Sequence, residues 1–210
     1  REFIMKATVY TLSLLLLLFS CDTKTGNQSN QDSYRNQIAD LALEDLSQAE
    51  INSIYQMREE EKLARDVYRY FYNQFNQKIF TNIAESEQSH TDAIKVLIDR
   101  YDLTDPLNSN NSGVYDSKAL QDLYNSLIAK GTTLTAALSA GAEVEEIDII
   151  DLRVFLKDSI DNKDITLIYN NLLEGSYNHL QAFIKNLSNQ GITYSPRHLT
   201  QAEYSDILNK

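Results

Sequence analysis

Proline, glycine and tryptophan are scarce in this sequence of 210 residues. It contains two Pro, six Gly and no Trp. Because proline and glycine mark turns and interrupt helices, their scarcity argues against a turn-rich sheet protein and favours long helices. Charged residues make up 23% of the chain and hydrophobic residues 42%, as in an ordinary globular protein, and the length favours one domain.

Positive charge is also in short supply. The chain has 19 Lys and Arg against 30 Asp and Glu, which gives a formal net charge of −11. A nucleic-acid-binding surface needs a basic stripe, and attachment to anionic lipids by charge alone needs a basic patch. The composition therefore argues against both nucleic acid and a charge-driven membrane contact.

The single cysteine, Cys21, excludes disulfide bonds within the chain. It ends the stretch MKATVYTLSLLLLLFSC, whose leucine-rich run is short for a membrane span and is typical of a signal peptide over residues 1–20. The ending LFSC resembles a bacterial lipoprotein box, which predicts lipid attachment at Cys21 in the bacterial cell envelope, facing the periplasm or the cell surface. An ordinary signal peptide with an incidental cysteine is the alternative. Residues 21–37 are polar and aperiodic, and predict a flexible tether.

From residue 38 onward the hydrophobic pattern is helical, without strand-like alternation. Four long helices are expected at about 47–75, 79–101, 142–159 and 164–187. Capping boxes at Ser47 and Thr200 mark the start of the first long helix and of a short C-terminal helix. Two shorter pieces, SKALQDLYNSLIAKG and TLTAALSAG, each end at a glycine. The predicted fold is all-α, a ferritin-like four-helix bundle over residues 38–210 with a long helical crossover between its second and third helices.

The second long helix places two ionisable side chains inside its apolar face. At about 100° per residue, Glu87 and His90 fall within the stripe formed by Ile83, Ile94, Leu97, Ile98 and Tyr101. Burial of an ionised carboxylate needs a compensating charge, and a spacing of three residues lets both side chains reach one ion. Glu87 and His90 are therefore candidate metal ligands.

The first and third long helices add further carboxylates. The apolar centre of the first helix lies between Glu60 and Glu61, so at least one of the two reaches the edge of the core. The third helix carries Glu145 and Asp148 on an apolar face. It is apolar on a second side as well, which leaves three alternatives: Glu143, Glu146 and Asp151.

The fourth long helix offers a histidine but no inward carboxylate. Ser176 lies at the centre of its apolar face, His179 at the edge, and Glu174 well away from it. Carboxylates with imidazoles and without thiolates suit iron or manganese better than structural zinc. One or two ions of iron or manganese are the predicted cofactor. Polar side chains that merely form hydrogen bonds in the core are the alternative.

Four motifs carry a resemblance to the ferritin-like superfamily. EKLARDVYRYF is similar to the first ligand helix of rubrerythrins, with Ala64 and Tyr68 at matching positions, which selects Glu61 over Glu60. FTNIAESEQSH is similar to their second ligand helix. Together EEEKLARDVY, NIAESEQSH, EEIDIIDL and GSYNHLQAF resemble the prokaryotic ferritin-like family named domain of unknown function 2202, over about residues 41–204.

The resemblance implies a set of metal ligands by position. They are Glu61 as a terminal ligand, Glu87 and Glu145 as bridging ligands, Asp148 as a nearby shifting carboxylate, and His90 and His179 as nitrogen ligands. The chain departs from rubrerythrins at Ser176, where they have a glutamate three residues before the histidine. It also lacks their Cys₄ iron site, so the resemblance implies no electron supply for peroxidase turnover.

Three functions are compatible with the sequence. The first is a non-haem di-iron or di-manganese oxidoreductase that acts on peroxide or dioxygen, or oxidises ferrous iron. The second is a metal-binding protein with one ion and little catalysis. The third is a lipid-anchored structural or interaction protein. Metal ions and the membrane, reached through the lipid at Cys21, are the expected partners, and a homodimer is compatible with the sequence.

Overall fold

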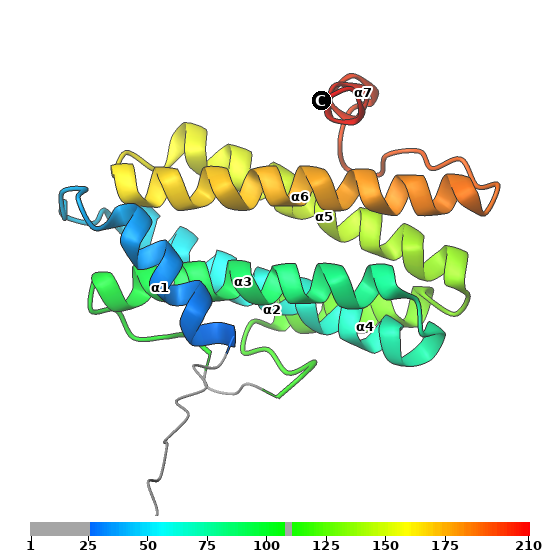
Figure 1. The fold of residues 1–210 in the computed structure, drawn as a ribbon, viewed down its shortest axis with the longest axis horizontal. Helices are drawn as coiled ribbons and strands as arrows, with labels where there is room; N and C mark the ends of the chain where they lie inside the picture. Colours follow the sequence, from blue (N-terminus) through cyan, green and yellow to red (C-terminus); the bar gives the residue numbers. More distant parts are fainter. Residues whose placement is uncertain (1–25, 108–110) are drawn as a thin grey trace, which may run out of the picture.

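The computed structural model describes residues 26–107 and 111–210, and in these ranges the chain forms helices and no strands (Figure 1). The expected all-α class is therefore confirmed. The helices are α1 (Gly26–Ile38), α2 (Gln48–Phe75), α3 (Lys78–Arg100), α4 (Lys118–Lys130), α5 (Leu134–Asp158), α6 (Lys163–Asn189) and α7 (Gln201–Leu208).

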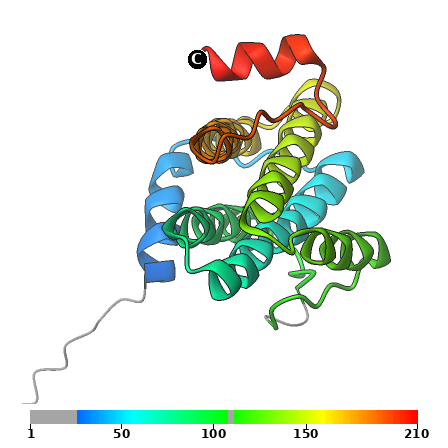
Figure 2. The same ribbon diagram turned by 90° about the vertical axis from the view of Figure 1, so that its right-hand side faces the viewer.

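The four long helices form two hairpins. α2 and α3 are joined by only Asn76 and Gln77, and Asn76 ends α2 in the left-handed conformation (φ 51°) while its N–H donates to the Tyr72 carbonyl at 2.7 Å. Residues 159–162 join α5 to α6. Connections this short make the joined helices antiparallel neighbours. α2 also packs against α5 and α3 against α6, so the four helices surround one interior (Figure 2).

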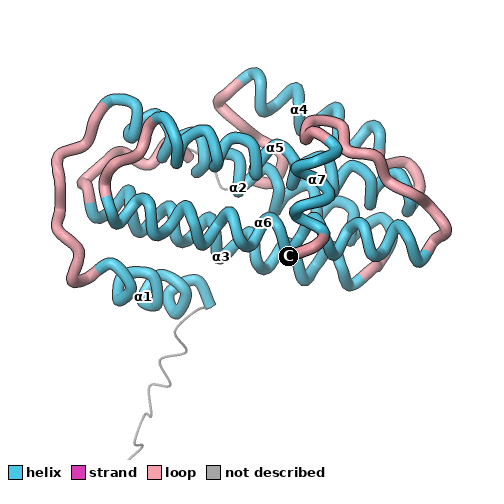
Figure 3. Tube along the Cα trace, turned by 90° about the horizontal axis from the view of Figure 1, so that it is seen from above, coloured by secondary structure: helices cyan, strands magenta, loops and turns pink. Residues whose placement is uncertain are grey.

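Both predicted capping boxes are confirmed. The Ser47 hydroxyl accepts the Glu50 N–H, and the Glu50 carboxylate accepts the Ser47 N–H at 2.9 Å. Thr200 and Glu203 repeat the arrangement at the start of α7, which runs across the α5–α6 hairpin (Figure 3). Each box satisfies two backbone donors that the first turn of a helix would otherwise leave unpaired.

The third long helix begins earlier than predicted. The piece TLTAALSAG does not end at Gly141 but forms the first turns of α5, which starts at Leu134 after the N-cap Thr133. A glycine is needed at position 141 because the Phe183 ring of α6 lies very close to it, and a Cβ there would be only 2.5 Å from that ring. This glycine therefore lets α5 and α6 approach closely, and does not act as a helix terminator.

The link between α3 and α5 carries α4 and is attached to α2 by buried charges. Lys62, fully buried, donates to Asp66 at 2.9 Å and to the Val114 carbonyl at 3.1 Å. Asp66 also accepts the Gly113 N–H at 3.0 Å and the Tyr115 hydroxyl at 2.9 Å. These bonds compensate the two buried charges and hold the link on the outer side of α2.

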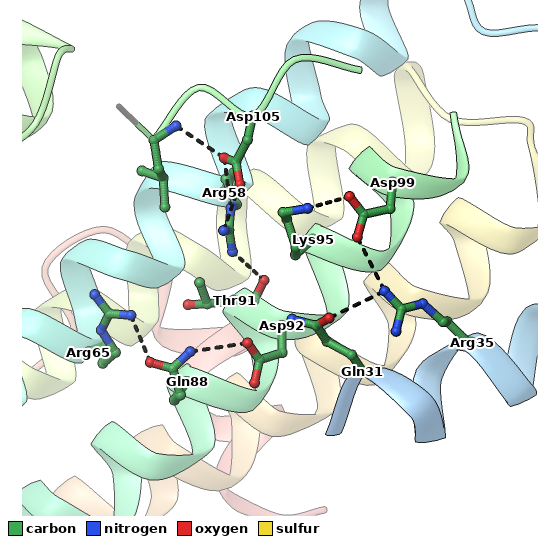
Figure 4. Close-up of polar contacts among 11 residues, drawn as sticks. Gln31, Arg35, Arg58, Arg65, Gln88, Thr91, Asp92, Lys95, Asp99 and Asp105 are labelled. Atoms are coloured by element: carbon green, nitrogen blue, oxygen red, sulfur yellow. Dashed lines mark hydrogen bonds and ion pairs between the residues drawn. The ribbon is translucent and has the colours of Figure 1, made fainter. Parts of the chain in front are cut away.

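The predicted tether is corrected over residues 26–37, which lie in α1. Tyr34 and Ser89 of α3 share a hydrogen bond of 3.1 Å, and Arg35 contacts Asp99 of α3 at 3.3 Å (Figure 4). Ile38, at the end of α1, is buried. The segment looks disordered by composition, but contacts with α3 stabilise it as a helix, which local sequence cannot reveal. Cys21, the predicted signal peptide and residues 21–25 of the tether lie outside the described residues.

Two apolar clusters fill the ends of the interior. One joins Phe71 and Phe80 to Phe183, and the other joins Met57 and Leu97, among other residues. The helices bring buried acidic and histidine side chains into the space between the clusters. None of the helices in the described ranges has the length and apolarity needed to cross a bilayer.

Candidate metal centre

Each of the four long helices contributes at least one side chain to a cluster of ionisable residues in the middle of the interior. Glu61 comes from α2, Glu87 and His90 from α3, Glu145 from α5, and His179 from α6. All five residues are buried, and none is more than 7% exposed. The inward orientation that helical periodicity predicted for Glu87 and His90 is therefore what the structure has, and Glu61 and Glu145, which periodicity left beside alternatives, are buried too.

The first group consists of Glu61, Glu87 and His90. His90 Nδ1 lies 3.1 Å from Glu61 Oε2 and 2.8 Å from Glu87 Oε2. One ring nitrogen thus faces two carboxylate oxygens from two different helices. Because Nδ1 carries at most one proton, a single hydrogen bond cannot satisfy both contacts well.

The second group consists of Glu87, Glu145 and His179, and repeats the first. His179 Nδ1 lies 2.8 Å from Glu87 Oε1 and 3.4 Å from Glu145 Oε2. The two groups share Glu87, which directs one carboxylate oxygen to each imidazole. The two rings are stacked with centroids 5.4 Å apart, so the groups lie side by side.

The donor atoms fit a cation better than they fit one another. Glu61 Oε1 is buried without a hydrogen-bond partner, and Glu87 Oε1, Glu145 Oε2 and His179 Nδ1 lie at ion-pair distance without forming a hydrogen bond of good geometry. Each such atom costs about 1–3 kcal/mol when nothing compensates it. Two ligands about 2.1 Å from an ion and at right angles lie about 3.0 Å apart, close to the four contacts above. Either group could therefore hold a metal ion.

Burial makes the carboxyl groups hard to ionise in the absence of a cation. It raises the pKa of Glu61 to about 8, even though His90 acts in the opposite direction. Burial also raises the pKa of Glu145. Glu87 differs, because the imidazoles of His179 and His90 outweigh its burial and lower its pKa. The central carboxyl is thus the one that stays ionised.

The pKa values of the two imidazoles are raised, so that their positive charge balances this negative charge. Burial by itself would lower the pKa of His179, but Glu87 and Glu145 raise it to about 10. Glu61 and Glu87 hold the pKa of His90 well above its usual value in the same way. The metal-free centre therefore retains protons that a divalent cation would replace.

Three neighbouring residues position the ligands. Ser86 Oγ lies 2.8 Å from His179 Nε2, and the Tyr68 hydroxyl donates to Glu145 Oε1 at 2.5 Å. Gly175 leaves room for the other imidazole. Sequence reasoning did not assign roles to Ser86 and Gly175. A glycine in the interior of α6 is the signal that could have pointed to a close approach.

Asp148 lies in the same interior but belongs to neither group. It is buried, and burial together with the nearby Glu61 and Glu145 carboxylates holds its pKa well above the usual range. Its assignment as a shifting carboxylate stays a prediction. The alternatives on α5 face elsewhere: Glu146 accepts backbone N–H groups of the segment before α7, and Glu143 pairs with Lys130.

α6 supplies no carboxylate to the centre. Ser176 is buried and donates to the Leu172 carbonyl of its own helix at 3.1 Å, whereas Glu174 is exposed. The predicted departure from the rubrerythrin pattern is therefore present in the folded chain. The second group has a single histidine from α6 and depends on Glu87 and Glu145 for its oxygen ligands.

Comparisons with known proteins agree with the resemblance to the domain of unknown function 2202. A family described as "Uncharacterized protein domain (DUF2202)" matches residues 50–210. An uncharacterized protein, MJ0754, from Methanocaldococcus jannaschii is 42% identical over 173 residues, which cover 82% of this chain and 93% of that protein. The crystal structure of hypothetical protein MJ0754 from Methanococcus jannaschii DSM 2661 is similar with a TM-score of 0.79 and 42% identity, covering 81% of this chain and 97% of that one. The chain belongs to the DUF2202 family.

Proposed function

We propose that this protein is a ferritin-like metal-binding protein whose four-helix bundle holds a dinuclear iron or manganese centre and works as a non-haem oxidoreductase. The observation that carries the proposal is the carboxylate of Glu87, whose two oxygens each lie 2.8 Å from a different imidazole. A carboxylate shared in this way is suited to lie between two cations, with one histidine on either side.

The ligand residues would form two metal positions. Glu61 and His90 would hold one ion, Glu145 and His179 the other, with Glu87 common to both. The bound metals would supply the redox chemistry toward peroxide or dioxygen, or toward ferrous iron. The chain itself orients the ligands through Ser86 and Tyr68.

The apolar clusters at both ends keep bulk water from the centre. This favours tight binding of the ions, because charge interactions strengthen as water is excluded. A purely structural polar core accounts less well for the same residues. It would leave Glu61 Oε1 without a partner, and Glu87, Glu145 and His179 joined only by ion pairs of poor hydrogen-bond geometry.

Metal analysis tests the proposal directly. Protein purified without added metal, or reloaded anaerobically with Fe²⁺ or Mn²⁺, should hold about two ions per chain. His90→Ala and His179→Ala should each weaken binding at one position, and the iron-loaded wild type should consume peroxide or dioxygen. His198→Ala is the control, because this third histidine is largely outside the interior. A wild type that binds no metal would refute the proposal. Stoichiometric binding without any such oxidation would leave only the simpler metal-binding function.

We also propose that the protein is lipid-anchored in the bacterial cell envelope through Cys21. The proposal rests on the leucine-rich run and the LFSC ending of the sequence. One acyl chain binds a membrane only weakly, so stable attachment would need more than one chain.

A further inference from the structure

A narrow pocket lies among the side chains of α2, α4 and α5, three helices that pack against one another (Figure 2), and Asp148 of the interior forms part of its lining. Its lining consists of two carboxylates, Glu60 and Asp148, and five aliphatic side chains, without a single Lys or Arg. Glu60 and Leu120 also line a wider outer groove of about 480 Å³ between α2 and the start of α4. Glu60 therefore lies where the open groove narrows into the pocket.

Glu60 is buried in an unusual state. The residue is only 6% exposed, and no N–H or O–H donor of the described residues reaches its Oε2. The other oxygen, Oε1, accepts from Gln56 at 2.9 Å. A carboxylate oxygen left unpaired in such a place is unfavourable unless something transient or absent from the polypeptide binds it.

A second carboxylate faces Glu60 from α5. The carboxylates of Glu60 and Asp151 accept from the same side-chain amide of Gln56, Glu60 Oε1 at 2.9 Å and Asp151 Oδ2 at 3.4 Å. Two carboxyl groups from different helices thus meet at the mouth of the pocket. No side-chain cation contacts Glu60 in the described part of the chain.

The inner end of the pocket is Asp148, one helical turn from Asp151 on α5. Besides burial, the carboxylates of Glu61, Glu145 and Glu60 raise the pKa of Asp148, and Glu61 is a residue of the first metal group. Carboxylates therefore follow one another from the outer groove to the centre. Each step passes between α2 and α5.

Size limits what can pass. The pocket has a free volume of about 10 Å³, close to the minimum that admits one water molecule. An organic substrate does not fit, whereas a small cation that has shed most of its water does. The carboxyl groups at the mouth of the pocket can exchange their protons for a cation, which concentrates cations there.

We propose that Glu60 and Asp151 form a loading site that captures a hydrated divalent cation from the outer groove and passes it along Asp148 to the metal centre. The ligand class is Fe²⁺ or Mn²⁺ with its remaining water. The inference rests on the proposed function, because it presumes that the interior binds metal. It adds that the cation enters between α2, α4 and α5. It also adds that Glu60, Asp151 and Asp148, which belong to neither metal group, control its entry.

The test separates the rate of loading from the final occupancy. Metal-free protein is mixed anaerobically with Co²⁺, and its absorption is followed to completion at low ionic strength. Glu60→Gln and Asp151→Asn should slow loading by about tenfold or more, while the final Co²⁺ content and affinity stay near those of the wild type. Leu120→Trp narrows the mouth without changing charge and should also slow loading. Glu85→Gln, an exposed substitution on α3, is the charge-matched control and should load normally.

The outcomes distinguish the two proposals. Wild-type loading rates in Glu60→Gln and Asp151→Asn, with full occupancy, would overturn the loading site and leave the metal centre standing. A fall in the final Co²⁺ content of Glu60→Gln would also overturn it, because Glu60 would then be a ligand of the centre. A wild type that takes up no Co²⁺ would refute the loading site together with the proposed function.

Discussion

Gly175 determines how closely α6 can approach the His90 imidazole. A Cβ at this position would lie 2.5 Å from His90 Nε2 and 2.6 Å from Cε1. In the metal-free protein the ring can turn aside, since it is the end of a side chain. A ring held by metal through Nδ1 cannot do so without losing a ligand.

Gly175→Ala should therefore weaken metal binding without destabilising the metal-free fold. Alanine is better than glycine in a helix by about 1 kcal/mol, which offsets the weakened contacts of His90 with Glu61 and Glu87, so the free energy of unfolding of the metal-free variant should stay close to that of the wild type. Metal affinity should fall by about tenfold or more, a size typical of losing a positioning contact. Calorimetric titration with Mn²⁺ and urea unfolding measure the two effects. Asn170→Ala on the exposed side of α6 is the control, and unchanged affinity in Gly175→Ala would contradict the assignment of His90.

The shifted ionisable groups make the stability of the metal-free protein depend on pH. Glu61 has a pKa of about 8 against 4.5 in the unfolded chain, and His179 about 10 against 6.5. A raised pKa means that the folded state binds more protons than the unfolded chain. The resulting stability is complete below the unfolded pKa and is lost as pH rises through the folded one. Glu87, with its lowered pKa, acts oppositely and loses its contribution as pH falls below about 4.5.

The metal-free protein should accordingly be most stable in mild acid, and its free energy of unfolding should decline from about pH 5 to pH 10. Divalent metal should reverse the trend, because the cation replaces the protons and binds more tightly as they leave. Urea unfolding across this range, with and without Mn²⁺, measures both slopes. Stability of the metal-free protein that rises between pH 6 and pH 9 would contradict the buried arrangement of the ligands.

At the scale of the element, Glu146 attaches the C-terminal segment to α5. Its carboxylate accepts the backbone N–H groups of Arg197 (2.9 Å), His198 (2.7 Å) and Leu199 (2.9 Å), and the Tyr194 hydroxyl at 2.6 Å. This buried carboxylate accepts from four donors. A glutamine amide would replace one acceptor oxygen by an NH₂ group, which would then face a donor N–H or O–H.

Glu146→Gln should lower the free energy of unfolding by about 2 kcal/mol and expose residues 190–210 to protease. Glu143→Gln removes the same charge one turn away, but its partners Lys130 and Arg197 are half exposed. Its effect should stay below about 1 kcal/mol. Chemical unfolding and limited proteolysis compare the two variants, and equal effects would mean that the backbone contacts contribute little.

At the scale of the whole molecule, the proposed anchor predicts where the protein is found. Cys21→Ser should release it from the membrane fraction or block its processing, because the lipid would have no attachment point. Fractionation followed by mass measurement of the mature N-terminus tests this. A variant that fractionates and migrates like the wild type would show that Cys21 is incidental. Ser20→Ala is a control that keeps the thiol.

Sequence periodicity determined the helices of the molecule and the side chains that face its interior. Glu87 and His90 could be identified because helix geometry places residues three and four apart on one face. The same geometry placed Glu145 and His179 among the candidates, whereas the resemblance to rubrerythrins selected Glu61 over Glu60. The boundaries of α2 and α7 followed from local capping chemistry, which the first turn of each helix contains entirely.

Only the tertiary structure decided which of these side chains meet. Glu87 faces both histidines because α6 lies against α3, and the distance between two helices is not encoded in the period of either. For the same reason the sequence could not reveal which side chains Gly141 and Gly175 accommodate, or that residues 26–37 fold as α1 on α3. Local sequence specifies helices through bonds a few residues long. The metal groups, the close approaches and the docked N-terminal helix arise from contacts between residues far apart in the chain, which exist only after the helices pack.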